Sequence, residues 1–278
     1  MVDALIALDD GPTWAAPLLA FDTSTEVMAL AVCGPGGAFS LAAAGGAAAS
    51  ATLLPQALRL LACANLTLND LRAIAFGGGP GAFTGLRTAC AVAQGLGLGL
   101  SVPLLPLDSL LVVAEDARLQ CVGPDCAADK DPFEVVVAMD ARMNEVYVGR
   151  YRWERVAAAG GAQDGPAYGS QLQHDWLVLQ APQLCDLPTL AQAWAMAPPP
   201  VLAGSARAAF GPRLPVPHNT VYVEKEHNRS AALLRLAARA WAAGQAVDAA
   251  QALPLYVRDK VAQTTQEREQ ARDQARTP

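Results

Sequence analysis

GGGPGAFTGLR, at residues 77–87, is the stretch of this chain that decides the fold. The apolar residues 73–76 before it predict a short strand, and the apolar residues that follow predict a helix over 84–99. A glycine-rich loop at the start of a helix lets backbone N–H groups approach an anion. This loop lacks the lysine of a P-loop and does not fit G-x-G-x-x-G, so a tight structural turn and an anion site both stay open.

Upstream of this unit, the pattern predicts a hairpin. Residues 18–22 and 27–32 are apolar strands joined by the polar turn TSTE, and a third strand is expected near 39–43. A helix is expected at 53–64, where Pro55 falls in a tolerated early position. Downstream, a strand at 104–105 and a helix at 107–117 complete the first half of the chain.

The first hairpin has a counterpart in the second half. VVAMDARMNEVYVGRY at 136–151 can be laid on LLAFDTSTEVMALAV at 18–32, and each has a strand ending in Asp, a polar turn, and Glu leading a second strand. This weak duplication predicts two related α/β lobes rather than a solenoid. We expect an irregular leader at 1–17, lobes at 18–118 and 119–259, and a charged, flexible tail at 260–278.

Composition excludes several classes of protein. The 278 residues are 53% hydrophobic and 17% charged, which favours a folded globular chain over disorder. The net charge is −6, from 20 basic and 26 acidic residues, so the chain lacks the field that a stand-alone nucleic-acid binder needs. Any role on RNA must be local or supplied by a partner.

The sequence shows neither a set of metal ligands nor the nucleophile of a hydrolase. The six cysteines never form a C-x-x-C pair and are expected to be buried, reduced thiols. His174, His218 and His227 lack the spacing of a metal pair, and there is no G-x-S-x-G elbow. Acidic residues near the N-terminus argue against a signal peptide, and glycine and proline interrupt both long uncharged runs. We therefore expect a cytoplasmic protein without a metal site or a membrane span.

Candidate chemistry gathers at the two hairpins and the glycine-rich loop. Asp22 with Thr23 and Ser24 could hold a phosphate, and Asp140 could bind a metal or act as a base. The same residue types are also preferred in hairpin turns for their local hydrogen bonds, and on spacing alone that interpretation is favoured.

The helices expected at 53–64 and 84–99 are apolar nearly all round. Such a helix is either buried between layers or packed against a partner's helices, and burial is the simpler interpretation from the pattern alone.

Four segments together resemble one protein family. These are GGGPGAFTGLR, LLAFDTST at 18–25, AMDARMNEVY at 138–147 and LPLYVRDKVA at 253–262. In order and spacing they are similar to the TsaB (YeaZ) family, over roughly residues 18–266.

The resemblance implies an actin-like (ASKHA, ribonuclease H-like) α/β fold of two lobes with duplicated topology. It also implies a part in forming N6-threonylcarbamoyladenosine at position 37 of tRNAs that read codons beginning with A. In that family the metal-bearing paralogue TsaD is catalytic, TsaB is its non-catalytic dimerisation partner, and the ATPase TsaE joins the complex. The chain would then carry no cofactor of its own, although ATP and Mg²⁺ could sit at a composite interface with TsaE, and alone it could form a homodimer.

The resemblance also implies roles for two sets of residues. The partner surface lies on the two helices of the first lobe, with the candidates Leu54, Leu58, Leu61, Phe83, Leu86, Arg87 and Cys90. A vestigial or composite nucleotide site would comprise Asp22, Thr23, Ser24, Gly79, Gly81 and Asp140.

The chain departs from the family pattern at two places. Residues 48–52 lack the histidine found in many members, so any contact made by that histidine is missing. Ala82 replaces a serine before Phe-Thr-Gly, and the loss of this hydroxyl weakens the interpretation of the loop as a phosphate site.

The competing hypothesis is an independent ASKHA-type ATPase or phosphotransferase that uses Asp22, Thr23, Gly81 and Asp140. A peptidase is disfavoured, because neither a nucleophile with its base nor a metal pair is visible.

Overall fold

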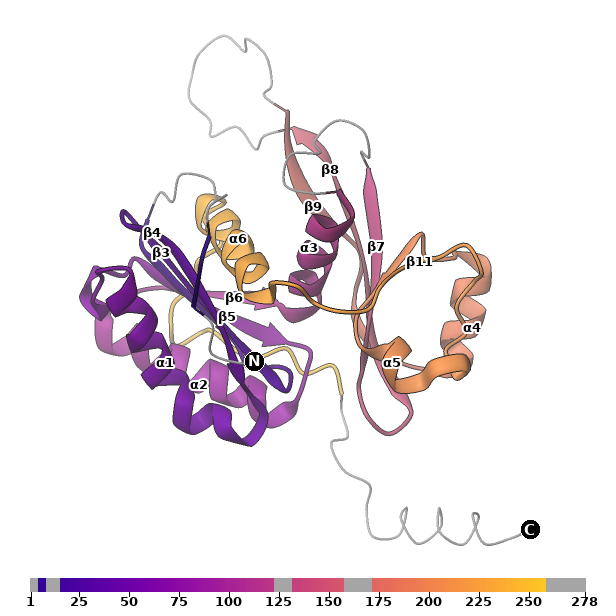
Figure 1. The fold of residues 1–278 in the computed structure, drawn as a ribbon, viewed down its shortest axis with the longest axis horizontal. Coiled ribbons are helices and arrows are strands. Elements are labelled where there is room, and N and C mark those ends of the chain that lie inside the picture. Colours follow the sequence, from indigo (N-terminus) through magenta and orange to yellow (C-terminus); the bar gives the residue numbers. More distant parts are fainter. Residues whose placement is uncertain (1–4, 9–15, 123–131, 158–171, 259–278) are drawn as a thin grey trace, which may run out of the picture.

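The computed structural model describes residues 5–8, 16–122, 132–157 and 172–258, which form two lobes, each built on one mixed sheet (Figure 1). The first sheet has the order β1-β4-β3-β2-β5-β6 and the second has the order β11-β10-β7-β8-β9. The strands are β1 (Leu5–Ala7), β2 (Leu18–Asp22), β3 (Val27–Gly34), β4 (Gly37–Ala44), β5 (Ala73–Gly79), β6 (Leu104–Asp108), β7 (Phe133–Asp140), β8 (Glu145–Ala157), β9 (Leu172–Asp186), β10 (Val201–Ala203) and β11 (Val221–Val223).

The two lobes repeat one topology. In each, three antiparallel strands (β2-β3-β4 and β7-β8-β9) are followed by two strands that extend the sheet in parallel (β5-β6 and β10-β11). A helix follows the third, fourth and fifth strand of each set. The helices are α1 (Ala49–Cys63), α2 (Phe83–Leu100) and α3 (Ser109–Val122) in the first set, and α4 (Leu187–Met196), α5 (Ala206–Phe210) and α6 (Arg229–Ala242) in the second.

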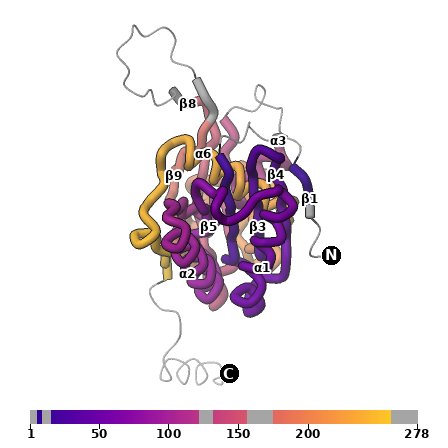
Figure 2. The backbone as a smooth tube through the Cα atoms, turned by 90° about the vertical axis from the view of Figure 1, so that its left-hand side faces the viewer, coloured from indigo at the N-terminus to yellow at the C-terminus, as the bar shows by residue number. Residues whose placement is uncertain are grey.

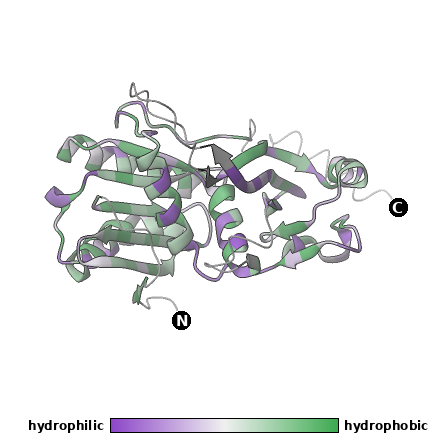
Figure 3. Cartoon of the chain, turned by 90° about the horizontal axis from the view of Figure 1, so that it is seen from above, coloured by the Kyte–Doolittle hydropathy of each residue, from purple (hydrophilic) through white to green (hydrophobic). Residues whose placement is uncertain are grey.

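Helices cover both faces of the first sheet. The helices α1 and α2 contact each other and lie side by side at the end of the molecule away from the second lobe (Figures 1 and 2). Leu53, Ala57 and Leu60 of α1 recur at helical spacing and are buried against the sheet. The strands between these helices and α6 are largely hydrophobic along their length, as the green ribbons of Figure 3 show, because both faces of the sheet are covered.

The last described part of the chain returns to the first lobe. Helix α6 packs on β2 and β3 and contacts α3, and α3 in turn packs on β7 and β8 of the second sheet. Residues 247–258, here called the strap, run back from a bridge between Leu104 and Val247 along α2. The expected boundary at 118/119 therefore falls inside α3, and the expected second lobe includes α6, which packs on the first sheet. Contacts between residues more than a hundred positions apart decide this arrangement.

Residues 5–7 differ from the irregular leader that the sequence predicts. They form β1, which pairs antiparallel with β4 at the edge of the first sheet, and the N–H of Leu8 donates to the carbonyl of Ala38. An edge strand of three residues is too short to show a period in the sequence. Residues 1–4 and 9–15 of the leader, and the tail from 259, lie outside the described residues.

Most predicted elements are confirmed, with shifted ends. The strand predicted at 18–22 is β2, and the helix predicted at 84–99 is α2, one residue longer at each end. Cys33, Cys63, Cys90 and Cys185 are free thiols, as expected, but Cys63 is exposed rather than buried. Among the described residues no helix is long and apolar enough to span a bilayer.

Candidate functional site: the interlobe cavity and the α1–α2 face

A cavity of about 920 Å³ lies between the lobes and is lined by residues of both. The first lobe lines it with the β2–β3 turn, the loop before α2 and the strap. The second lobe lines it with the β7–β8 turn and the start of α5. Of the six candidates for a nucleotide site, Ser24, Gly81 and Asp140 line this cavity. The side chains of Asp22 and Thr23 are buried, and these two residues and Gly79 are not among the lining residues.

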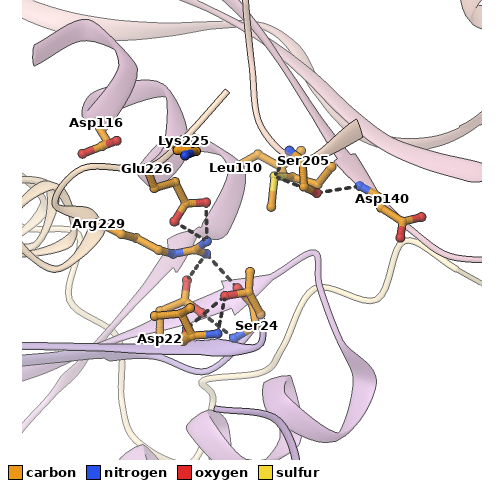
Figure 4. Close-up of polar contacts among 12 residues, drawn as sticks. Asp22, Ser24, Leu110, Asp116, Asp140, Ser205, Lys225, Glu226 and Arg229 are labelled. Carbon is orange, nitrogen blue, oxygen red and sulfur yellow. Dashed lines mark hydrogen bonds and ion pairs between the residues drawn. The ribbon is translucent and has the colours of Figure 1, made fainter. Parts of the chain in front are cut away.

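Asp22 is held by a buried arginine that the sequence analysis missed (Figure 4). One terminal nitrogen of Arg229 donates to Asp22 Oδ2 at 2.9 Å and to Ser24 Oγ at 2.8 Å, and the other lies 3.1 Å from Glu226 Oε1. The N–H of Ser24 donates to Asp22 Oδ1 at 2.6 Å. Among the described residues Arg229 Nε has no hydrogen-bond partner.

This cluster keeps both partners charged. Burial disfavours ionisation of Asp22, but the guanidinium of Arg229 and the hydrogen bonds from Ser24 outweigh it and hold the pKa of that carboxyl below its usual value. Burial likewise disfavours the charged form of Arg229, and Glu226 and Asp22 outweigh it, so its pKa is raised. A divalent cation at Asp22 would have to displace a guanidinium that is already bonded there. The residues present therefore do not fit a magnesium nucleotide held by Asp22.

The glycines of the loop serve close packing against the β2–β3 turn. A Cβ at Gly77 would overlap the carboxylate of Asp22, and a Cβ at Gly85 would overlap the carbonyl oxygen of Thr23. The hydroxyl of Thr23 donates to the carbonyl of Gly85 at 2.7 Å, and the N–H of Ala82 donates to the carbonyl of Ser24 at 2.8 Å. Of the two interpretations left open for this loop, these contacts support the structural turn.

Asp140 lies across the cavity at the end of β7. Its N–H donates to Ser205 Oγ, its Oδ1 accepts the N–H of Arg142 at 2.9 Å, and Oδ2 lies 3.5 Å from Arg142 Nη1. Arg142 also reaches Glu26 of the first lobe at 3.6 Å. Asp140 thus makes the hydrogen bonds of a hairpin turn and takes part in an exposed link between the lobes. No group of three or more metal-ligating side chains is present in the described part of the chain.

The second candidate site is the exposed side of α1 and α2. Leu54 and Leu58 are 40% and 45% exposed, Arg87 is exposed and Phe83 is half-buried. Residues at helical spacing along this side make up what we call the α1–α2 face: Ala51, Leu54, Leu58 and Ala62 on α1, with Thr84, Arg87, Ala91, Gly95 and Leu98 on α2.

Three of the seven predicted interface residues do not reach this surface. Leu61, Leu86 and Cys90 are 2%, 2% and 5% exposed. Leu61 and Cys90 belong to the core under the helices, and the thiol of Cys90 donates to the carbonyl of Ala252. These three predictions are wrong because both helices are apolar all round, and the sequence pattern does not separate the buried side of such a helix from the exposed one.

Two further contacts join residues that no pattern in the sequence connects. Asp108 accepts the N–H groups of Leu110 and Leu111 and the hydroxyl of Tyr151 at 2.6 Å, which joins the first sheet to β8. Tyr256 of the strap accepts a hydrogen bond from Arg87 Nε at 3.2 Å. For Arg229 one signal was visible, since a basic residue in the first turn of a helix is disfavoured by the helix dipole.

Comparisons with known proteins agree on one family. A family model described as "TsaD: tRNA N6-adenosine threonylcarbamoyltransferase" matches residues 47–265. YeaZ from Pseudomonas aeruginosa, a solved structure, is 32% identical with a TM-score of 0.64, and the match covers 87% of this chain and 99% of that one. The chain belongs to the TsaB (YeaZ) family.

Curated TsaB proteins support the same assignment. The TsaB protein of Escherichia coli is 27% identical over 247 residues, which span 88% of this chain and 96% of that one. The TsaB protein of Haemophilus influenzae is 36% identical over 144 residues, and this match spans 52% of this chain and only 57% of the relative. The expected fold is confirmed: it is the actin-like ASKHA fold, and its two lobes repeat one topology.

Proposed function

We propose that this chain is the non-catalytic scaffold subunit of a complex that forms N6-threonylcarbamoyladenosine at position 37 of tRNAs reading codons that begin with A. Its curated relatives are named tRNA threonylcarbamoyladenosine biosynthesis proteins. In this proposal it pairs with a TsaD protein through the α1–α2 face, TsaE docks across the pair, and the chain meets tRNA as part of the complex. A cytoplasmic location follows from a role on tRNA.

The observation that carries the proposal is the exposed apolar side of two neighbouring helices. Leu54, Leu58 and Leu98 are 40%, 45% and 62% exposed on one face of the molecule. Between them stand small residues, and at Gly95 and Gly99 an added Cβ would meet no atom within 4 Å. Large apolar side chains around small ones form a surface on which another helix pair can pack closely.

The buried pair of Asp22 and Arg229 supports a non-catalytic role. The carboxylate that would hold a metal-bound phosphate in an independent ATPase is already neutralised by a guanidinium 2.9 Å away. The alternative, an independent ASKHA-type ATPase or phosphotransferase, would also need a cation to grip the phosphates, and the loop at 77–81 contains glycine and proline only. Any bound ATP and Mg²⁺ would then rely on TsaE.

The test is co-expression with the TsaD protein of the same genome, followed by measurement of co-elution and of molar mass by light scattering. We expect a heterodimer with the unmodified chain and none with Leu58→Glu, because a charge placed in an apolar interface stays unpaired there. Met196→Glu is the matched control, since Met196 is an 88% exposed apolar residue on α4 of the other lobe.

Other outcomes would contradict the proposal. A heterodimer that survives Leu58→Glu would show that the α1–α2 face is not the contact surface. A chain that does not bind TsaD and hydrolyses ATP alone, with turnover lost in Asp140→Asn, would favour the independent phosphotransferase. Homodimers of the chain alone that are lost with Leu58→Glu would mean that self-association uses the same face, and this result would leave the pairing with TsaD standing.

A further inference from the structure

The interlobe cavity offers apolar surface that the proposed function does not use. Val27, Met143, Leu255 and Tyr256 line it and are 47%, 49%, 46% and 47% exposed, so large apolar side chains of both lobes gather around one cavity. Sites for small molecules are cavities of this size, lined mainly by apolar and aromatic side chains with a few polar groups among them. The walls therefore suit a ligand with an apolar or aromatic body.

The charged residues in the lining leave one cation without a partner. Arg258 pairs with Glu145, but Lys225 has no carboxylate partner among the described residues. One free cation is too few for the several negative charges of a nucleoside triphosphate. The carboxylates that line the cavity are paired with arginines: Glu26 and Asp140 with Arg142, Glu224 with Arg207, and Glu226 with Arg229.

Two serine hydroxyls in the lining also have a proton to donate. Ser109 is 1% exposed, and its Oγ accepts the N–H of Gly79 at 3.2 Å. Ser205 Oγ accepts the N–H of Asp140 at 3.1 Å and lies 3.8 Å from the sulfur of Met139, which is a weak acceptor. Within the described part of the chain, neither hydroxyl proton meets an oxygen acceptor. These two hydroxyls and the ammonium group of Lys225 can therefore all donate to a ligand.

The fold brings these three donors to one part of the wall. Strands β10 and β11 are parallel neighbours with Ala203 opposite Val223, and Ser205 and Lys225 follow these paired residues at the carboxyl ends of the strands. Helix α3 begins at Ser109, and its next residue packs in the same core cluster as Ala203 and Val223. Figure 4 shows Ser205 and Lys225 on one side of the cavity. Ligands of α/β proteins commonly bind beside the carboxyl ends of parallel strands.

We propose that the interlobe cavity binds a small organic monoanion with an apolar or aromatic body, such as an aromatic carboxylate, and that Lys225, Ser109 and Ser205 hold its acidic group. The exposed apolar side chains of the lining cover its body. This inference goes beyond the proposed function, because none of the residues of the α1–α2 face lines the cavity.

The experiment compares two fluorescent probes that share one aromatic body. The probe 8-anilinonaphthalene-1-sulfonate is a monoanion, and N-phenyl-1-naphthylamine lacks the sulfonate. Fluorescence titration of the full-length chain with each probe measures the affinity and the number of sites. We expect a single site for the anionic probe, and binding of the neutral probe that is weaker by about tenfold or more, because it makes no charge-assisted hydrogen bonds.

Two variants locate the site. Lys225→Glu should weaken binding of the anionic probe by about tenfold or more, whereas Lys225→Arg should keep the affinity because it keeps the charge. Ala208 is exposed and lines the cavity, so Ala208→Trp should fill part of the cavity and weaken binding of both probes.

Each variant has a matched control. Arg72 and Ala195 are exposed and are not among the lining residues. Arg72→Glu and Ala195→Trp should therefore change either affinity by less than about twofold. Thermal melting of each variant checks that it folds.

Three results would overturn the inference. Equal affinities for the two probes, with no effect of Lys225→Glu, would show that the site does not select an anion. Binding that is lost with Leu58→Glu and kept with Ala208→Trp would place the probe on the α1–α2 face. Displacement of the anionic probe by micromolar MgATP would assign the cavity to a nucleotide. Pairing with TsaD is measured separately by co-elution, so the proposed function stands or falls independently of these results.

Discussion

Arg229 stands at the first position of α6, where the dipole of the helix disfavours a positive charge. It is nevertheless 6% exposed, because Asp22, Ser24 and Glu226 surround its guanidinium with acceptors. A buried ion pair of this kind adds little net stability when both partners are present, since desolvation offsets much of the attraction. Removing one partner is different, because the other charge then stays buried alone.

We therefore expect Arg229→Met to lower the free energy of unfolding by about 3–5 kcal/mol at neutral pH. Asp22 would remain buried and ionised without its cation. Urea denaturation followed by circular dichroism measures the change. The double variant Asp22→Asn with Arg229→Met should recover a large part of the loss, because it removes the unpaired charge. A single variant that loses less than about 1 kcal/mol would show that water or another cation satisfies Asp22.

Helix α2 shows how one element uses glycine in two ways. Gly85 is buried against the β2–β3 turn, and a Cβ there would overlap the backbone oxygen of Thr23. Gly95 is exposed on the opposite side of the same helix, and a Cβ there would meet no atom within 4 Å. The periodicity of the sequence predicts the helix but does not distinguish these two glycines.

The two glycines should respond oppositely to alanine. Gly85→Ala should destabilise the chain by about 2–3 kcal/mol, because a backbone oxygen cannot move aside easily. Gly95→Ala should stabilise it by about 0.5–1 kcal/mol, because alanine favours the helix and fills open space. Thermal or urea unfolding of the two variants side by side checks both signs. Equal effects would mean that the turn at Thr23 shifts to accommodate a methyl group.

At the scale of the whole molecule, contacts at three places tie the lobes together. The hydroxyl of Tyr151 donates to Asp108, and the carboxylate of Asp116 on α3 accepts the N–H groups of His227 and Asn228, just before α6. Arg258, the last residue of the strap, donates to the carbonyl of Ala141 and pairs with Glu145 at 2.7 Å. Each of these contacts joins a segment of the first lobe to a segment of the second.

The contact between Asp108 and Tyr151 should make stability depend on pH. Burial raises the pKa of Asp108 from its usual value of 3.8 to about 6, and the hydrogen bonds from Tyr151, Leu110 and Leu111 only partly oppose this. Asp22, the charged group that faces it from β2, raises the pKa slightly further. Between about pH 4 and pH 6 the folded chain thus binds a proton that the unfolded chain has released, so the free energy of unfolding contributed by this group falls as pH rises.

We expect Asp108→Asn to remove this part of the pH dependence. Relative to the unmodified chain, the variant should gain about 2–3 kcal/mol as the pH rises from 4 to above 6, and the difference should then stay constant. Asparagine keeps an oxygen for the N–H groups at the start of α3 and adds no charge. Urea unfolding across pH 4–8 measures it. Parallel profiles for the two proteins would show that Asp108 titrates normally in the folded state.

Sequence alone determined the local elements and the family. Alternating apolar residues, turn residues and the glycine-rich loop placed β2, β3, β5 and α2 within a few residues. Two similar hairpins, whose first strands end in Asp22 and Asp140, predicted the duplicated lobes. All of these features depend on residues close together in the chain, because the side chains of neighbouring residues set the local backbone conformation.

Only the tertiary structure decided which of those residues meet. Asp22 and Arg229 are 207 positions apart, and Arg87 and Tyr256 are 169 positions apart, so no spacing rule connects them. The return of α6 and the strap to the first sheet converts Asp22 from a candidate ligand into one partner of an ion pair. The packing of α1 on the first sheet and on α2 separates the exposed Leu58 from the buried Leu61. The physical reason is that burial and charge pairing belong to the packed molecule, whereas the pattern along the chain records only that a residue is apolar or charged.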